Sequence, residues 1–118
     1  MVVVAPSAAL VQRVRAALAT HPSVREITMF GGLAFMVSEK MVVCARGDGD
    51  LLVRSDPARA DELLRREGAG PAEMGAGRPM SKSWISVGPE AIATDDGLTF
   101  WIGVALEHHR RGIAPVTG

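Results

Sequence analysis

The chain has 118 residues, of which 47% are hydrophobic and 22% charged, and its 13 basic residues balance its 13 acidic ones. This length suits one packed core, so we expect a single domain over residues 1–118, with its core at 7–111 and a flexible tail at 112–118. The charge balance argues against direct nucleic-acid binding and against attraction to an anionic membrane.

The compartment is predicted from the one cysteine and from the N-terminus. Cys44 has no second cysteine with which to form an internal disulfide. The N-terminus lacks basic residues, and Pro6 and Ser7 interrupt its apolar run, which argues against a signal peptide. No apolar run approaches the roughly 20 residues needed to cross a bilayer. We therefore expect a cytoplasmic protein without a membrane segment.

The first half of the chain predicts one helix followed by four strands. Helical spacing of apolar residues predicts a helix over 7–20, with Ser7 as its N-cap and the His21-Pro22 pair as its end. Strands are predicted at 24–30, 33–38, 40–46 and 50–54. Their connections, Gly31-Gly32, Glu39-Lys40 and 47–49, are of hairpin length and leave no room for a crossover. The expected arrangement is an antiparallel meander.

The second half predicts two more helices and one more strand. A helix starts at Ser55-Asp56-Pro57 and stops at Gly68. Residues 69–78, rich in Gly, Ala and Pro, are predicted as a flexible loop, 80–88 as a fifth strand, and 97–111 as a third helix capped by residues 94–96. The order α-β-β-β-β-α-β-α indicates a two-layer α+β fold. Its antiparallel β-sheet would have about five strands, with the helices packed on one face.

Alternation within the strands predicts two apolar sheet faces. The face toward the helices would carry Leu33, Phe35, Val37, Leu51, Val53, Ile85 and Val87; the other would carry Ala34, Met36, Val42, Cys44, Leu52, Met80 and Trp84. A solvated face should alternate to polar residues, so an apolar second face needs a cover. We expect a second copy of the chain to provide it, which predicts a homodimer through the apolar sheet face.

No constellation in the sequence points to catalysis. Cys44 lies in mid-strand without a nearby activating His or Lys, which favours inert packing. His108 and His109 point about 100° apart on a helix, so they do not form a metal-binding pair. The favoured interpretation is that, with Arg110 and Arg111, they complement the helix C-terminus as cations. We expect no catalytic residues, no metal and no cofactor.

One alternative to a protein-interaction role stays open. Gly47 to Asp50 form a turn between strands and match no dinucleotide fingerprint. Basic side chains nearby in the predicted fold could nonetheless converge on a ligand. The alternative is a small-anion or small-ligand binding protein with a pocket near Arg54, Lys82 and Trp84.

The segment Met29-Phe30-Gly31-Gly32-Leu33-Ala34-Phe35-Met36-Val37 resembles the N-terminal domain of the TfoX/Sxy family. The hallmark of that domain is a Met-Phe-Gly-Gly turn that leads into an aromatic-bearing strand. Later segments follow in the family's order: 40–46, then Asp50-Leu51-Leu52-Val53-Arg54, then 80–87, then the helix 97–111. Arg54 stands where the family favours Tyr and Lys. The resemblance covers about residues 10–111.

The resemblance implies a fold like that of the type III secretion chaperones and a role in regulating transcription for competence, through the CRP regulator. We therefore expect a non-enzymatic module that binds a regulatory protein. Gly31 and Gly32 are expected to form a two-residue turn with positive φ. The candidate motif and interaction residues are Met29, Phe30, Gly31, Gly32, Met36, Arg54, Met80, Lys82 and Trp84.

Overall fold

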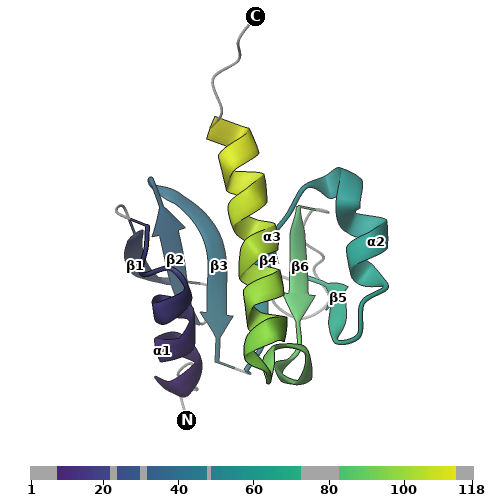
Figure 1. The fold of residues 1–118 in the computed structure, drawn as a ribbon, viewed down its shortest axis with the longest axis horizontal. Helices are drawn as coiled ribbons and strands as arrows, with labels where there is room; N and C mark the ends of the chain where they lie inside the picture. Colours follow the sequence, from purple (N-terminus) through teal and green to yellow (C-terminus); the bar gives the residue numbers. More distant parts are fainter. Residues whose placement is uncertain (1–7, 22–23, 30–31, 48, 73–82, 114–118) are drawn as a thin grey trace, which may run out of the picture.

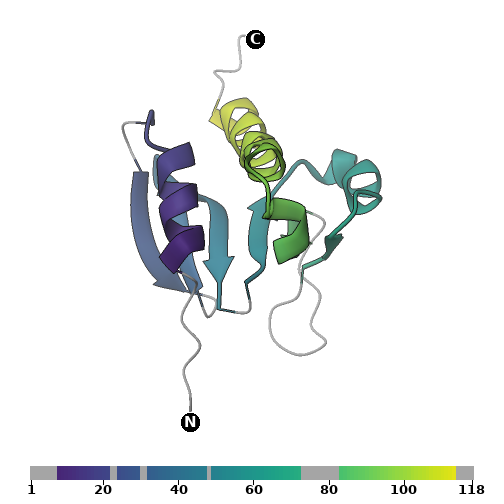
Figure 2. The same ribbon diagram turned by 60° about the horizontal axis from the view of Figure 1, so that its bottom comes forward.

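The computed structural model of the chain describes residues 8–21, 24–29, 32–47, 49–72 and 83–113. Six strands form one antiparallel sheet in the order β1-β2-β3-β4-β6-β5, and helices cover one of its faces (Figure 1 and Figure 2). The strands are β1 (Val24–Met29), β2 (Gly32–Val37), β3 (Lys40–Arg46), β4 (Leu51–Arg54), β5 (Ala69–Pro71) and β6 (Trp84–Val87). The helices are α1 (Ala8–Ala17), α2 (Ala60–Leu64) and α3 (Asp95–Ile113), with 3₁₀ turns η1 (Pro57–Arg59) and η2 (Pro89–Ile92). The predicted α+β class and antiparallel sheet are confirmed.

The sequence did not predict β5, whose residues were assigned to a loop. Its residues pair with β6, Ala69 opposite Val87 and Pro71 opposite Ile85. Gly and Pro composition indicated a loop, yet proline is tolerated on an edge strand because one side of that strand makes no ladder hydrogen bonds. The order is therefore α-β-β-β-β-α-β-β-α. No helix in the described part of the chain is long and apolar enough to span a membrane.

Side-chain caps set where the helices begin. The carboxylate of Asp56 accepts a hydrogen bond from the Ala58 amide at 2.9 Å, and the Thr94 hydroxyl accepts one from the Gly97 amide at 3.1 Å. Each bond satisfies an amide that the helix itself leaves without a partner. Helix α3 thus starts two residues before its predicted first residue. The predicted cap Ser7 lies outside the described residues.

The hydrophobic core lies between the sheet and the helices. It joins side chains of α1 and α3, with Leu63 of α2, to the inner face of the strands: Leu10, Val11, Val14, Leu18, Phe35, Val37, Val42, Val43, Ala45, Leu51, Val53, Leu63, Ile85, Val87, Ile92, Leu98, Trp101, Ile102, Val104 and Ala105. Every predicted inward residue belongs to this core or, like Leu33, packs against it half-buried.

Val42 was predicted on the second face, and that assignment is wrong. Phe35 pairs with Val43 while Met36 pairs with Met41, so Val42 is an extra residue in β3. A bulge of this kind interrupts the two-residue alternation. Val42 therefore packs in the core beneath the helices, and Met41 takes its place on the second face.

The second face is apolar, as predicted, but its centre is buried within the single chain. Ala34, Cys44 and Leu52 each have an exposed fraction of 0%. Met36 and Trp84 pack against them and are half-buried. Met80 lies outside the described residues. Among the described residues, the apolar surface that a second copy could cover is therefore smaller than the sequence indicated.

Gly32 is not a turn residue. It is the first residue of β2, paired with Met29 on one side and Arg46 on the other. The positive-φ glycines among the described residues are Gly49 and Gly68. What demands glycine at position 32 is space, because an added Cβ would collide with the carbonyl oxygen of Ala45 and lie 2.7 Å from the Cα of Arg46. Gly31 lies outside the described residues.

Candidate functional site

The predicted interaction residues that the structure describes lie in two places on the sheet. Arg54 and Trp84 face each other across β4 and β6, with the guanidinium carbon 5.6 Å from the centre of the indole ring. Met36 shares their sheet face, whereas Gly32 lies at the start of β2 and acts through its close approach to β3. For Met29 the structure describes only the backbone, which pairs with Gly32. Phe30, Gly31, Met80 and Lys82 lie outside the described residues.

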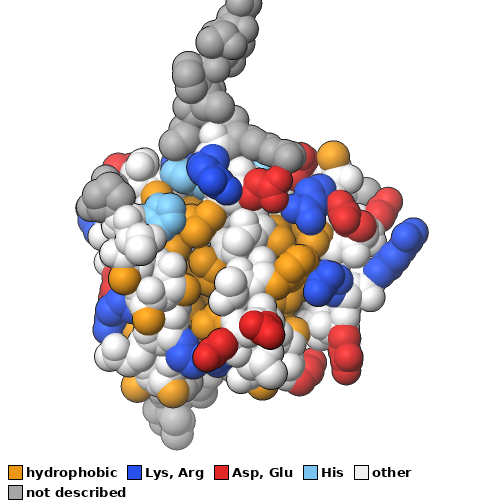
Figure 3. All heavy atoms as spheres, in the orientation of Figure 1, with side chains coloured by type: hydrophobic (Ala, Val, Ile, Leu, Met, Phe, Trp, Pro, Cys, Tyr) orange, Lys and Arg blue, Asp and Glu red, His pale blue; other side chains and the backbone are white. Residues whose placement is uncertain are grey.

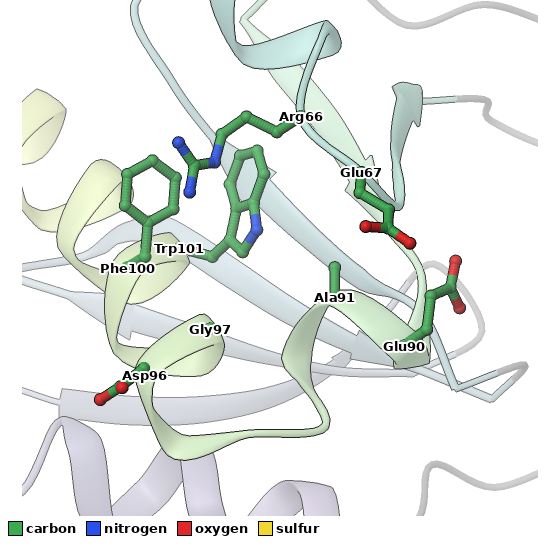
Figure 4. A pocket seen from close by; sticks show the side chains of 8 residues that line it. All are labelled: Arg66, Glu67, Glu90, Ala91, Asp96, Gly97, Phe100 and Trp101. Atoms are coloured by element: carbon green, nitrogen blue, oxygen red, sulfur yellow. The ribbon is translucent and has the colours of Figure 1, made fainter.

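A hollow of about 500 Å³ lies where η2 and α3 meet the segment that follows α2 (Figure 4). It is lined by Arg66, Glu67, Glu90, Ala91, Asp96, Gly97, Phe100 and Trp101. In the close view the Arg66 side chain reaches toward the Phe100 ring. Glu67 and Glu90 lie on the other side of the hollow, while the Asp96 carboxylate points outward. The hollow therefore has an aromatic end and an acidic end.

The aromatic end is built in two layers. Trp101 is buried, with 2% of its surface exposed, and the half-buried Phe100 meets it edge to face at 5.2 Å between ring centres. The exposed Arg66 covers Phe100, with its guanidinium carbon 3.7 Å from the ring centre. A cation over a ring face is attracted by the ring quadrupole. Arg66 thus shields an aromatic ring that solvent would otherwise meet.

Backbone hydrogen bonds hold the acidic end in place. The Gly88 amide donates to the Gly68 carbonyl at 2.8 Å, and the Ala91 amide donates to the Gly88 carbonyl at 3.0 Å. Gly68 has φ +83°, a left-handed conformation that glycine adopts at low cost. These bonds bring the loop that carries Glu67 close to η2, which carries Glu90. The eight lining residues include no Ser, Thr, Cys or His.

A second, smaller cavity of about 40 Å³ lies under the C-terminal half of α3. It is lined by Lys40, Met41, Val42, Arg54, His108 and His109. His109 is 8% exposed, and burial is the main reason why its pKa falls below the ordinary histidine value. Nearby basic groups lower that pKa further. The burial and the lowered pKa of His109 disagree with the prediction that it is a cation complementing the helix C-terminus.

Cys44 is buried, and its thiol has low reactivity. Its exposed fraction is 0%, and burial raises the pKa of its thiol to about 11, against a smaller opposing effect of Arg46. A thiol that keeps its proton at neutral pH is a poor nucleophile. Among the described residues, no three His, Cys, Asp or Glu side chains gather where they could hold a metal ion.

The comparison with known families agrees with this architecture. Residues 16–109 match the TfoX N-terminal domain, from within α1 to within α3. The chain belongs to the TfoX N-terminal domain family. The family assignment made from residues 29–37 and the strands that follow is confirmed. None of the curated proteins matches the chain.

Sequence reasoning missed the hollow of this TfoX N-terminal domain. Leu98, Trp101, Ile102 and Ala105 form the core-facing stripe of α3, and the half-buried Phe100 lies outside that stripe. The sequence signal for the hollow was an aromatic residue that lies outside the core-facing stripe of its helix. Arg66 gave no signal, because an arginine near a helix end is ordinary.

Proposed function

We propose that this TfoX N-terminal domain is a non-enzymatic module that binds a partner protein through the hollow between η2, α3 and the segment that follows α2. The observation that carries the proposal is the Arg66–Phe100 stack beside an acidic rim. Aromatic residues and arginine are enriched at protein interfaces and at the positions that dominate binding energy. Here they stand together on an accessible surface.

The stack is weak enough to open for a partner. Arg66 is exposed, and an exposed cation–π contact contributes about 0.5–1 kcal/mol. A partner's apolar side chain could displace Arg66 and cover Phe100 itself. The arginine would then keep the ring covered in the unbound protein and release it on binding.

The charges around the hollow define the partner's chemistry. Glu67 and Glu90 supply two carboxylates at the acidic end, against the single guanidinium of Arg66 at the aromatic end. Complementary charge selects partners and speeds encounter. The expected partner segment is therefore basic and amphipathic, with an apolar residue for Phe100 and Lys or Arg for Glu67 and Glu90.

The proposed role is regulatory. Membership of the TfoX N-terminal domain family supports a partner among transcription regulators and a part in competence. The proposal includes a cytoplasmic location, which agrees with a single cysteine. It includes no catalytic step and no cofactor.

A homodimer through the second sheet face is part of the proposal. The half-buried Met36 and Trp84 lie on this face and would be its apolar contacts. Their combined side-chain surface is well below the roughly 800 Å² that each partner buries in a standard interface. Such a dimer would therefore need contacts beyond these two residues.

The binding proposal is tested with charge reversals at the rim. The double variant Glu67→Lys/Glu90→Lys is compared with Asp61→Lys/Glu62→Lys, which makes the same charge change at exposed positions of α2. Proteins retained from a lysate of the source cells by the wild type and by the control, but lost with the rim variant, are candidate partners. The sequence of each candidate is then divided into overlapping peptides, and the binding of each peptide is measured.

The expected result is that a basic, amphipathic peptide binds the wild type and the Asp61→Lys/Glu62→Lys control alike. Its Kd for the rim variant should be at least about tenfold weaker, since two favourable charges become repulsive. Equal retention of every protein by the wild type and the rim variant would refute the proposed surface.

A further inference from the structure

The small cavity under α3 is surrounded by basic groups from four parts of the chain. His109 and His108 come from α3, Lys40 from the start of β3, and Arg54 from the end of β4. His21, which follows α1, also acts on His109. Figure 3 shows histidine side chains beside a basic one at the end of the molecule where the C-terminal half of α3 lies.

The charges that face His109 all have the same sign. The groups that influence its imidazole electrostatically are Lys40, His21, Arg54 and His108, in that order, and each one disfavours a proton on it. Like charges gathered in a partly buried space repel one another more than they do in water. A negative charge placed among them would relieve this repulsion.

Two polar atoms at the cavity lack hydrogen-bond partners. The Nε2 atom of His109 and the Nε atom of Arg54 are both buried, and neither has a partner within the described part of the chain. His109 is more than nine-tenths buried. A buried polar atom without a partner is costly, so such groups in native proteins usually contact water or an ion.

We propose that Lys40, Arg54, His108 and His109 form a binding site for a small anion. The cavity of about 40 Å³ is far below the about 300–1,000 Å³ of pockets for drug-sized ligands. It fits chloride, or one end of a carboxylate or phosphate group whose remainder stays at the mouth. Arg54 would stay oriented by its stacking on Trp84, 5.6 Å from the ring centre.

Binding should be coupled to protonation of His109. Burial and basic neighbours lower the pKa of His109 and so favour its neutral form. An anion beside it favours the imidazolium and raises that pKa. Protonation and anion binding therefore assist each other, and affinity should rise as the pH falls below about 6.5, the ordinary histidine value.

The test follows the His109 imidazole by ¹⁵N NMR during pH titrations at constant ionic strength. Chloride, acetate and inorganic phosphate are compared with a bulky sulfonate that is too large for the cavity. The expected result is a His109 pKa about one unit higher in at least one small anion than in the sulfonate. Chloride acting alone would identify a monatomic ion, and acetate or phosphate would identify an oxyanion group.

Variants separate a built site from general charge effects. Arg54→Gln should raise the half-saturating anion concentration by roughly tenfold, since one of the site's charges is removed, and Arg54→Lys should restore most of the affinity. Arg65→Gln, at an exposed arginine after α2, is the control and should leave it unchanged. Should Arg54→Gln fail to fold, Lys40→Gln serves in its place.

The proposal is overturned if the His109 pKa is the same in all four anions at equal ionic strength. That outcome would assign the cavity to water alone. Equal anion affinity in the wild type and the Arg54→Gln variant would overturn it as well. Neither result depends on the hollow at Phe100, so this proposal and the protein-binding proposal succeed or fail separately.

Discussion

Gly32 of β2 lies directly against the carbonyl oxygen of Ala45 in β3, leaving no room for a Cβ between the two strands. The Met-Phe-Gly-Gly segment thus requires glycine at this position because of packing within the sheet. Both strands lie near the sheet's centre, where neighbours on each side prevent the backbone from moving away. Because Gly32 lies so close to Ala45, one added methyl group at position 32 should already destabilise the fold.

Gly32→Ala should destabilise the protein by about 1–3 kcal/mol, the usual cost of forcing an extra methyl group into a packed site. Gly103→Ala is the matched control, because nothing lies within 4 Å of its added Cβ on the exposed side of α3. Alanine there should stabilise the helix by up to about 1 kcal/mol. Urea unfolding of both variants checks the opposite signs. Equal effects of the two substitutions would show that the Gly32–Ala45 contact is not tight.

Substitutions in the turn between β2 and β3 should increase the stability of the protein. Ser38 and Glu39 have φ of 51° and 69°, a left-handed conformation at both central residues. Such turns favour Asn-Gly, so Ser38→Asn/Glu39→Gly should raise the free energy of unfolding by about 1 kcal/mol. Glu39→Gln is the control: it removes the exposed ion pair with Arg25 but keeps the backbone, and should change stability little. A double variant no more stable than the wild type would contradict this turn geometry.

Cys44 should resist modification in the folded protein. Because it is buried and its pKa is raised to about 11, alkylation by iodoacetamide at pH 8 should be at least about 100-fold slower than in urea. The raised pKa also determines the direction in which stability changes with pH. Above pH 9 the unfolded thiol ionises while the folded one keeps its proton, so stability should fall between pH 9 and about 11. Cys44→Ala should weaken this fall, and rapid labelling of the native protein would contradict the buried site.

The homodimer is tested at Trp84. Full burial of an apolar side chain contributes about 1.5–3 kcal/mol, so covering Met36 and Trp84 would favour association. Light scattering after size exclusion should then give a dimer for the wild type and for Trp84→Phe, and a monomer for Trp84→Lys. A wild-type monomer at high micromolar concentration would exclude this dimer and leave the hollow at Phe100 unaffected.

Local signals allowed the sequence to predict most of the fold. Period-two and period-3.6 patterns located five strands and three helices, and Asp56 and Thr94 acted as caps where their residue types suggested. Three features depended on distant pairing instead. Val42 is displaced by a bulge, Pro71 joins an edge strand through its partner Ile85, and Gly32 is constrained by Ala45. None of these relationships is visible in a local stretch of residues.

The candidate sites were harder to predict than the fold. Arg54 and Trp84, which were predicted near one ligand pocket with Lys82, lie against each other, and Lys82 is outside the described residues. Phe100 and Arg66, however, are 34 positions apart in the chain and meet only because α2 and α3 pack against the same sheet. His109 was interpreted as a cation at the helix C-terminus, and its burial depends on β3 and β4 below it. Sites assembled from separate elements require the tertiary structure.

Site-specific photo-crosslinking tests the central claim, partner binding at the hollow, most directly. Arg66→p-benzoylphenylalanine places the reactive group over Phe100, and Asp61→p-benzoylphenylalanine places it on α2 as a matched control. We predict that position 66 crosslinks to a basic, amphipathic segment of one partner protein and that position 61 does not. Crosslinking from both positions to the same proteins in equal yield, or from neither, would contradict binding at the hollow.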